Sequence, residues 1–284
     1  MKFFLFFVGL FLINAHAAIS VQDDYGNVIT LQKPAQRVIS LSPTITELLF
    51  AAGGGERIVG AINYSDYPEA AQRIPKIGND QQIDMERVIA MKPDLVVAWL
   101  YSGSERQIAQ LKKLGIPVFQ SEQRKLEDIP YSILRFGQLL GTETIAQVSA
   151  AALSKKLVQL STQYKNRSPV RLFYQIGERP LYTLNGQHIV SDAIRLCGGV
   201  NVFAKLNVIA PLVSMEAVIL QNPEVIIVSG KEEGLKQWQA YPSVHAVRRN
   251  QLIAMDGNLL NRSGPRMIEG VAELCSKLEQ ARHR

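Results

Sequence analysis

The chain has 284 residues, of which 47% are hydrophobic and 20% are charged, and its formal net charge at pH 7 is +6. This length allows one large domain or two modest ones, and the ordinary apolar content excludes a mostly disordered chain. The basic residues are scattered rather than gathered into a stripe with interleaved aromatic side chains, so we do not expect a nucleic-acid partner.

The first 17 residues have the pattern of a secretory signal peptide. Lys2 is followed by an apolar run that extends to Ile13, and the small residues Ala15 and Ala17 precede the expected cleavage point. The run is shorter than the roughly 20 apolar residues that a membrane-spanning helix needs, so we predict cleavage rather than an anchor. No cysteine follows the run, and therefore we expect no lipid attachment there. The predicted product is soluble and exported.

Residues 18–140 alternate short apolar strands with helices. After an arm whose DDYGN suggests a hairpin turn, the predicted strands and helices are a strand at 37–41, a helix from 44 to the glycines at 53–55, a strand at 57–61, a helix and strand at 85–99, a helix at 105–115, a strand at 117–120 and a helix from about Leu126. Such alternation predicts a parallel sheet covered by helices on both faces.

Residues 141–168 predict one unusually long helix. Apolar residues such as Leu153, Leu157 and Leu160 recur at spacings of three and four, and no glycine or proline lies between Gly141 and Pro169. A helix of roughly 24 residues would be about 36 Å long, enough to join two lobes stiffly. The alternative is an ordinary surface helix of the first lobe.

Residues 169–284 repeat the α/β pattern and predict a second lobe. The expected order is a strand at 170–177, a helix ended by Gly198 and Gly199, a helix and strand at 215–229, a helix around Trp238, a strand at 251–256 and a last helix from Pro265. The fold class predicted for the chain is therefore α/β, with two Rossmann-like lobes, parallel sheets, one connecting helix and a ligand cleft between the lobes.

Two stretches 130 positions apart have nearly the same sequence. MERVIAMKPDLVVAW occupies 85–99, and MEAVILQNPEVIIVS occupies 215–229. Each follows a residue favourable at a helix N-cap and contains a proline that ends the helix before a β-branched strand. Glu86 and Glu216 fall in the first helical turn, where the helix dipole favours an anion. The period is too long for a solenoid and fits two similar lobes.

The two cysteines, Cys197 and Cys275, both lie in the second lobe. Export exposes them to an oxidising compartment, so we predict one disulfide between them, the alternative being two buried free thiols. The histidines left after signal cleavage, which are His188, His245 and His283, have no paired metal-ligand spacing. We therefore predict no metal site.

No catalytic motif supports an enzyme. The GGGER segment follows a helix, whereas a phosphate-binding loop precedes one, and no Walker, nucleophile-elbow or zincin motif occurs. Ser42 before Pro43 is interpreted as a helix N-cap rather than as a nucleophile. We predict no catalytic residue, and an exported hydrolase that uses the cleft remains the alternative from another class.

Ligands of open α/β sheets bind beyond the carboxyl ends of the strands. The residues expected there are Pro43, Thr44, 64–67, 99–101, Tyr182 and 258–262. Aromatic side chains at strand ends suit a large, partly apolar ligand with flat faces, although any single one of them could instead belong to the core.

Several stretches of the sequence together resemble a known family. RVISLSPTITELLFAAG, YSDYP, MERVIAMKPDLVVAW, ERQIAQLKKLGI, LCGGVNVF, VSMEAV and NRSGPR together are similar to periplasmic substrate-binding proteins of the helical-backbone class, which serve ABC importers of cobalamin, haem and ferric siderophores. The resemblance covers nearly all of the mature chain and is strongest to the cobalamin-binding members. It implies a periplasmic, monomeric receptor that captures cobalamin or a related corrinoid as a transported ligand, without a cofactor of its own.

The resemblance also assigns residues. Ligand contacts are implied for Tyr64, Trp99, Tyr182, Asn258 and Arg262, with Asn258 standing where members often carry aspartate. Asp80 and Ala210 stand where cobalamin-binding members carry tryptophan, and we expect Asp80 to contact the ligand as well. Glu86 and Glu216 match the glutamates that dock into arginines on the two membrane subunits of the importer. A haem receptor, with Tyr64, Tyr101 or His188 as the iron ligand, or a siderophore receptor that uses Arg262, is the alternative within the same fold.

Overall fold

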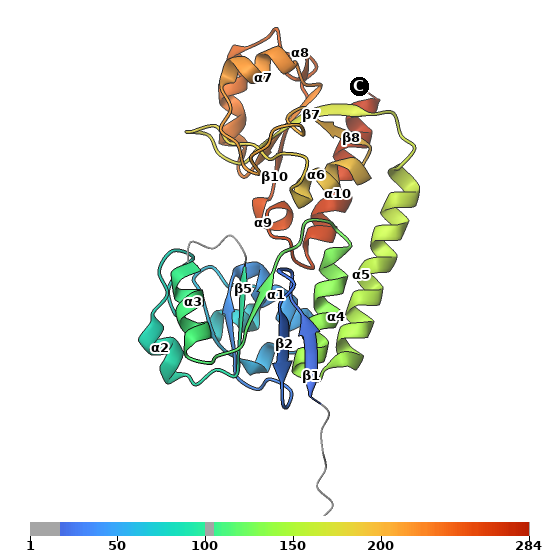
Figure 1. Cartoon of the computed structure of the whole chain (residues 1–284). Helices are drawn as coiled ribbons and strands as arrows, with labels where there is room; N and C mark the ends of the chain where they lie inside the picture. Colours follow the sequence, from blue (N-terminus) through green and yellow to red (C-terminus); the bar gives the residue numbers. More distant parts are fainter. Residues whose placement is uncertain (1–17, 100–104, 284) are drawn as a thin grey trace, which may run out of the picture.

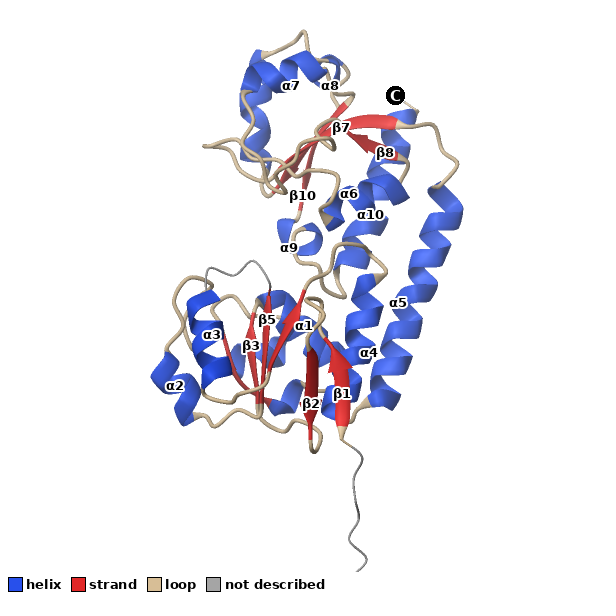
Figure 2. Cartoon of the chain, in the orientation of Figure 1, coloured by secondary structure: helices blue, strands red, loops and turns tan. Residues whose placement is uncertain are grey.

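The computed structural model describes residues 18–99 and 105–283. The predicted signal peptide and Tyr101 lie outside these residues. Within the described part, two α/β lobes lie one above the other, and a single long helix runs along one side of both (Figures 1 and 2). This arrangement confirms the predicted fold class.

The first lobe is built on a four-stranded parallel sheet with the strand order β4-β3-β5-β6. The strands are β3 (Val38–Leu41), β4 (Ile58–Ala61), β5 (Leu95–Trp99) and β6 (Val118–Ser121), and the helices are α1 (Pro43–Ala51), α2 (Met85–Ala90), α3 (Glu105–Lys113) and α4 (Asp128–Leu140), with 3-10 turns at Gly55–Arg57 and Glu69–Arg73. All four residues of β3 are buried, as expected of a strand covered on both faces. The predicted hairpin is the antiparallel pair β1 (Ile19–Gln22) and β2 (Val28–Leu31).

The second lobe repeats this plan with the strand order β10-β9-β7-β8, all parallel. Its strands are β7 (Val170–Gln175), β8 (Gly199–Asn201), β9 (Val225–Ser229) and β10 (Leu252–Met255), and its helices are α6 (Ile189–Leu196), α7 (Met215–Gln221), α8 (His245–Arg248), α9 (Gly257–Leu260) and α10 (Met267–Arg282). The short helix α9 has no counterpart in the sequence prediction.

The helix predicted around Trp238 is a 3-10 helix, Glu232–Ala240, and not an α-helix. Leu235 and Trp238 are three residues apart, and this spacing places both side chains on the same face of a 3-10 helix. Both pack into the second lobe's apolar core, and Trp238 Nε1 donates a hydrogen bond to Gln175 Oε1 at 2.8 Å.

The connecting helix α5 (Glu143–Tyr164) has 22 residues, which makes it about 33 Å long. It packs along α4 and α1 in the first lobe and against α6 and α10 in the second (Figure 1). The residues that it buries are spread along its length, with Ala146 and Ala150 near the start and Leu157 and Tyr164 near the end. The helix therefore spans both lobes rather than belonging to the first alone.

The repeated sequence forms the same unit in each lobe, α2 with β5 and α7 with β9. Asp84 Oδ1 accepts a hydrogen bond from Arg87 N at 3.0 Å, and Ser214 Oγ accepts one from Ala217 N at 3.1 Å, so both predicted caps are formed. Ser42 occupies the N-cap position of α1, as predicted, although its hydroxyl makes no capping hydrogen bond.

Cys197, which follows α6, and Cys275 in α10 are bonded to each other and fully buried. No helix in the described part of the chain is long and apolar enough to cross a membrane.

The disulfide gives a direct expected result. Thiol titration of the denatured, unreduced protein should find no free thiol, and titration after reduction should find two, because the chain contains only these two cysteines. The same titration on protein made in a reducing cytoplasm is the control. Two free thiols in the exported, unreduced protein would contradict the pairing.

Candidate functional site

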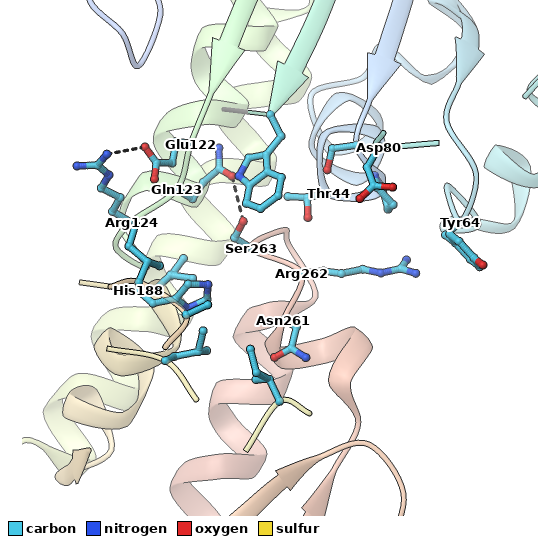
Figure 3. Close-up of a pocket in the computed structure, with 18 of the residues that line it drawn as sticks. Thr44, Tyr64, Asp80, Glu122, Gln123, Arg124, His188, Asn261, Arg262 and Ser263 are labelled. Carbon is cyan, nitrogen blue, oxygen red and sulfur yellow. Dashed lines mark hydrogen bonds and ion pairs between the residues drawn. The ribbon is translucent and has the colours of Figure 1, made fainter. Parts of the chain in front are cut away.

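A cavity of about 830 Å³ lies between the lobes, at the carboxyl ends of strands from both sheets (Figure 3). In the first lobe β3 is followed by Ser42, β5 ends at Trp99 and β6 is followed by Glu122, and all three residues line the cavity. In the second lobe Ile176 directly follows β7 and lines the opposite side. Both sheets therefore contribute to one site, as expected if ligands bind beyond the carboxyl ends of the strands.

The first-lobe wall carries two exposed aromatic side chains. Tyr64 is 77% exposed and Trp99 is 37% exposed, and both line the cavity. The backbone of Tyr64 has φ of 64°, a left-handed conformation that is uncommon for a bulky residue and concentrates at binding sites. Thr44, in the first turn of α1, and Asp80 line the cavity beside them.

A charged cluster joins the lobes, and one of its members, Arg262, lines the cavity. Glu47 of α1 is buried, with only 1% of its side chain exposed, and it accepts hydrogen bonds from Arg262 at 3.4 Å and from Arg266 at 2.6 and 3.0 Å. Arg262 also donates to Asp66 at 2.7 Å, and Arg266 lies over the ring of Tyr67. The hydrogen bond from Arg262 holds the pKa of Asp66 below its usual value.

The second arginine of the cavity is paired as well. Arg124 lies 2.9 Å from Glu122, which follows β6 (Figure 3). Beside this pair, Ser263 Oγ donates to Gln123 Oε1 at 3.1 Å and forms another bridge between the lobes. The carboxylate of Asp80 adds negative charge to the same wall. The cavity therefore combines apolar surface with arginines whose charge is balanced by neighbouring carboxylates.

The second-lobe wall is mostly apolar and contains one histidine. Leu184, Ile189, Val208 and Ile209 line the cavity there. His188 lies among them as the N-cap of α6, and its Nδ1 accepts a hydrogen bond from Val190 N at 3.2 Å. Burial lowers the pKa of His188 to about 4, so its ring is neutral at pH 7.

The predicted contact residues do not all meet in this cavity. Those that line it are Thr44, Tyr64, Asp80, Trp99 and Arg262. Tyr182 and Asn258 are absent from its lining. Tyr182 is 38% exposed and forms a β-bridge with Leu212. Asn258 lies in α9, which Asp256 caps, and it lines a neighbouring open hollow of about 890 Å³.

Three lining residues at 122–124 were missed by the sequence analysis. They directly follow β6. Because ligands bind beyond the carboxyl ends of parallel strands, the predicted strand at 117–120 could have indicated these residues as well. The apolar residues at 208 and 209 gave no comparable signal, because they lie outside any helix or strand. Among the described residues, no group of three or more His, Cys, Asp or Glu side chains is placed to hold a metal ion.

The chain is similar to periplasmic binding proteins both in sequence and in structure. Residues 38–259 match the periplasmic binding protein family. The vitamin B12-binding protein of Vibrio cholerae serotype O1 is 36% identical over 252 residues, covering 87% of this chain and 91% of that protein. The crystal structure of periplasmic vitamin B12-binding protein BtuF of Vibrio cholerae superposes with a TM-score of 0.83, over 88% of this chain and 99% of that one. A periplasmic haem-binding protein from Roseiflexus sp. RS-1 is 25% identical, with a TM-score of 0.75 over 87% of this chain and 99% of that one.

Proposed function

Because the chain belongs to the periplasmic binding protein family, we propose that it captures cobalamin or a related corrinoid in the periplasm and delivers it to an ABC importer. The ligand is held between the lobes by non-covalent contacts and is released unchanged. The similarity to vitamin B12-binding proteins along most of the chain is the observation that carries this proposal.

The shape of the site supports a large, flat ligand. The cavity between the lobes and the open hollow beside Asn258 are neighbours, and Asn261 and Arg262 line both. A ligand that fills the cavity and extends into this hollow would contact Asn258 as well as Trp99. Exposed aromatic faces with apolar neighbours suit the face of a corrin ring.

The charge of the site favours cobalamin over its anionic competitors. Haem carries two carboxylates, and most ferric siderophores are anionic, so their receptors need cations that are available to the ligand. Here Arg262 is mostly buried in ion pairs with Glu47 and Asp66, and Arg124, whose side chain is 60% exposed, forms an ion pair with Glu122. The periphery of a corrin carries neutral amides, which can use both partners of such ion pairs as donors and acceptors.

Calorimetry with cyanocobalamin, haemin and a ferric siderophore tests the proposal directly. We expect binding of cyanocobalamin and at least tenfold weaker binding of the other two, a difference of about 1.4 kcal/mol or more. Tighter binding of haemin or of the siderophore would overturn the choice of ligand without affecting the family assignment.

Trp99→Ala should weaken cyanocobalamin binding by about 1–3 kcal/mol, the scale of burying a large side chain. Trp99 is partly exposed at the end of β5, so its ring is available to a ligand, whereas Trp238 is fully buried in the second-lobe core. Quenching of tryptophan fluorescence by the ligand should largely vanish in this variant. Unchanged affinity and quenching would show that the ligand does not reach Trp99.

A further inference from the structure

The two ring nitrogens of His188 have different surroundings. Nδ1 faces the start of α6 and accepts the hydrogen bond of Val190 N. Nε2 has no hydrogen-bond partner among the described residues. This nitrogen is not among the buried side-chain atoms left without a partner in the described part of the chain, so it is not fully buried, and His188 itself lines the cavity (Figure 3).

The helix cap selects the tautomer of this ring. A neutral imidazole has one nitrogen that donates and one that accepts. Because Nδ1 accepts from the backbone, its lone pair is used and the proton must be on Nε2. The reverse tautomer would place Nδ1–H against Val190 N–H, leaving two donors facing each other. The low pKa of His188 is consistent with this arrangement, because the ring carries a single proton at neutral pH.

We propose that the α6 cap makes His188 a fixed hydrogen-bond donor to the ligand, with Nε2–H directed to an oxygen acceptor and not to a metal ion. This inference rests on the proposed function for the identity of the ligand. In a corrinoid the acceptor is an amide carbonyl oxygen or a phosphate oxygen of the nucleotide loop. His188 is then a specificity-determining residue, because it favours acceptor-bearing ligands and offers no lone pair to iron or cobalt.

The tautomer can be measured without any ligand. After signal cleavage a tag-free protein contains only His188, His245 and His283, so a long-range proton–nitrogen correlation spectrum at pH 7 resolves each ring. We expect His188 to be neutral with the proton on Nε2, and His188→Ser identifies its signals by their loss. A proton on Nδ1 would overturn the inference even if cobalamin binds. The expected tautomer without cobalamin binding would instead contradict the proposed function alone.

Binding measurements test the donor role. His188→Ser keeps a favourable N-cap residue but removes the group that reaches into the cavity, so the fold should be retained. Losing one neutral hydrogen bond should weaken cyanocobalamin binding about two- to tenfold. The matched control is His245→Ser at the start of α8, which does not line the cavity, and its affinity should be unchanged. Equal affinity of the His188→Ser and parent proteins would overturn the donor role.

Cobinamide, which lacks the nucleotide loop, identifies the acceptor. The same loss of affinity for cobinamide and for cyanocobalamin in His188→Ser supports an amide carbonyl, and a loss confined to cyanocobalamin supports the phosphate. Aquocobalamin provides the opposing test, since replacement of its water by imidazole changes its visible spectrum. An imidazole-type spectrum in the parent protein that disappears in His188→Ser would show metal ligation and overturn the proposal.

Discussion

Reversing both repeated glutamates, Glu86→Arg with Glu216→Arg, is expected to abolish cobalamin uptake through the importer while leaving ligand affinity nearly unchanged. Both side chains are exposed, and neither lines the cavity. Figure 1 places α2 at the outer side of one lobe and α7 at the far end of the other. Hydrogen bonds from the Glu216 backbone and from the Ser214 hydroxyl hold the pKa of the Glu216 carboxyl below its usual value. Glu216 is therefore ionised under transport conditions.

The physical reason is charge complementarity. The resemblance implies arginines on the two membrane subunits, one facing each glutamate, and placing like charges together costs several kcal/mol of association. Ligand affinity should change by no more than about 0.5 kcal/mol, as is usual for surface substitutions away from a site. Uptake into reconstituted vesicles, measured beside calorimetry of the free protein, separates these effects.

A matched control uses the same change of charge on other helices. Glu143 and Glu269 are exposed and lie in the first turns of α5 and α10, so Glu143→Arg with Glu269→Arg repeats the disturbance of helix dipoles. Such effects are worth about 0.3–1 kcal/mol of stability each and should leave uptake normal. If the Glu86 and Glu216 double variant also transports normally, the repeat reflects only the similarity of the lobes.

Glu47→Ala should lower the free energy of unfolding by about 3–5 kcal/mol, the cost of breaking a buried ion pair from one side. Glu47 is almost fully buried and is the shared partner of Arg262 and Arg266. Its hydrogen bond raises the pKa of Arg266. Removing the carboxylate leaves a guanidinium that remains charged, because an arginine side chain stays protonated even without a partner. Urea denaturation followed by circular dichroism measures the loss.

A double-mutant cycle distinguishes the ion pair from simple loss of packing. Glu47→Met and Arg266→Met should each destabilise the protein, and the combined variant should lose clearly less than the two losses added, because no charge of this pair is then left alone. Glu56→Ala, which removes an exposed carboxylate in the same lobe, should change stability by no more than about 0.5 kcal/mol. Strict additivity in the cycle would show that Glu47 and Arg266 do not act together.

Some features of this protein were determined by the sequence alone, because their causes are local or periodic. The apolar runs at 95–99 and 225–229 predicted two buried strands, and both formed between neighbouring parallel strands. The glycine-free apolar stripe of α5 predicted its length to within about two residues. Asp84 and Ser214 cap their helices as predicted, since a cap depends only on the three residues that follow it.

Other features were decided only by the tertiary structure. No local sequence pattern indicates that Glu47 contacts Arg262 and Arg266, because Glu47 is more than 200 positions away from both arginines. They come together only when the two lobes pack against each other. Asn258 was predicted to face the ligand cavity, but α9 turns it into the neighbouring hollow, and Tyr182 is held in a bridge with Leu212. The predicted strands indicate at which edge of each sheet a ligand binds, because ligands bind beyond the carboxyl ends of the strands. The orientation of each side chain at that edge depends on how short turns pack between distant segments.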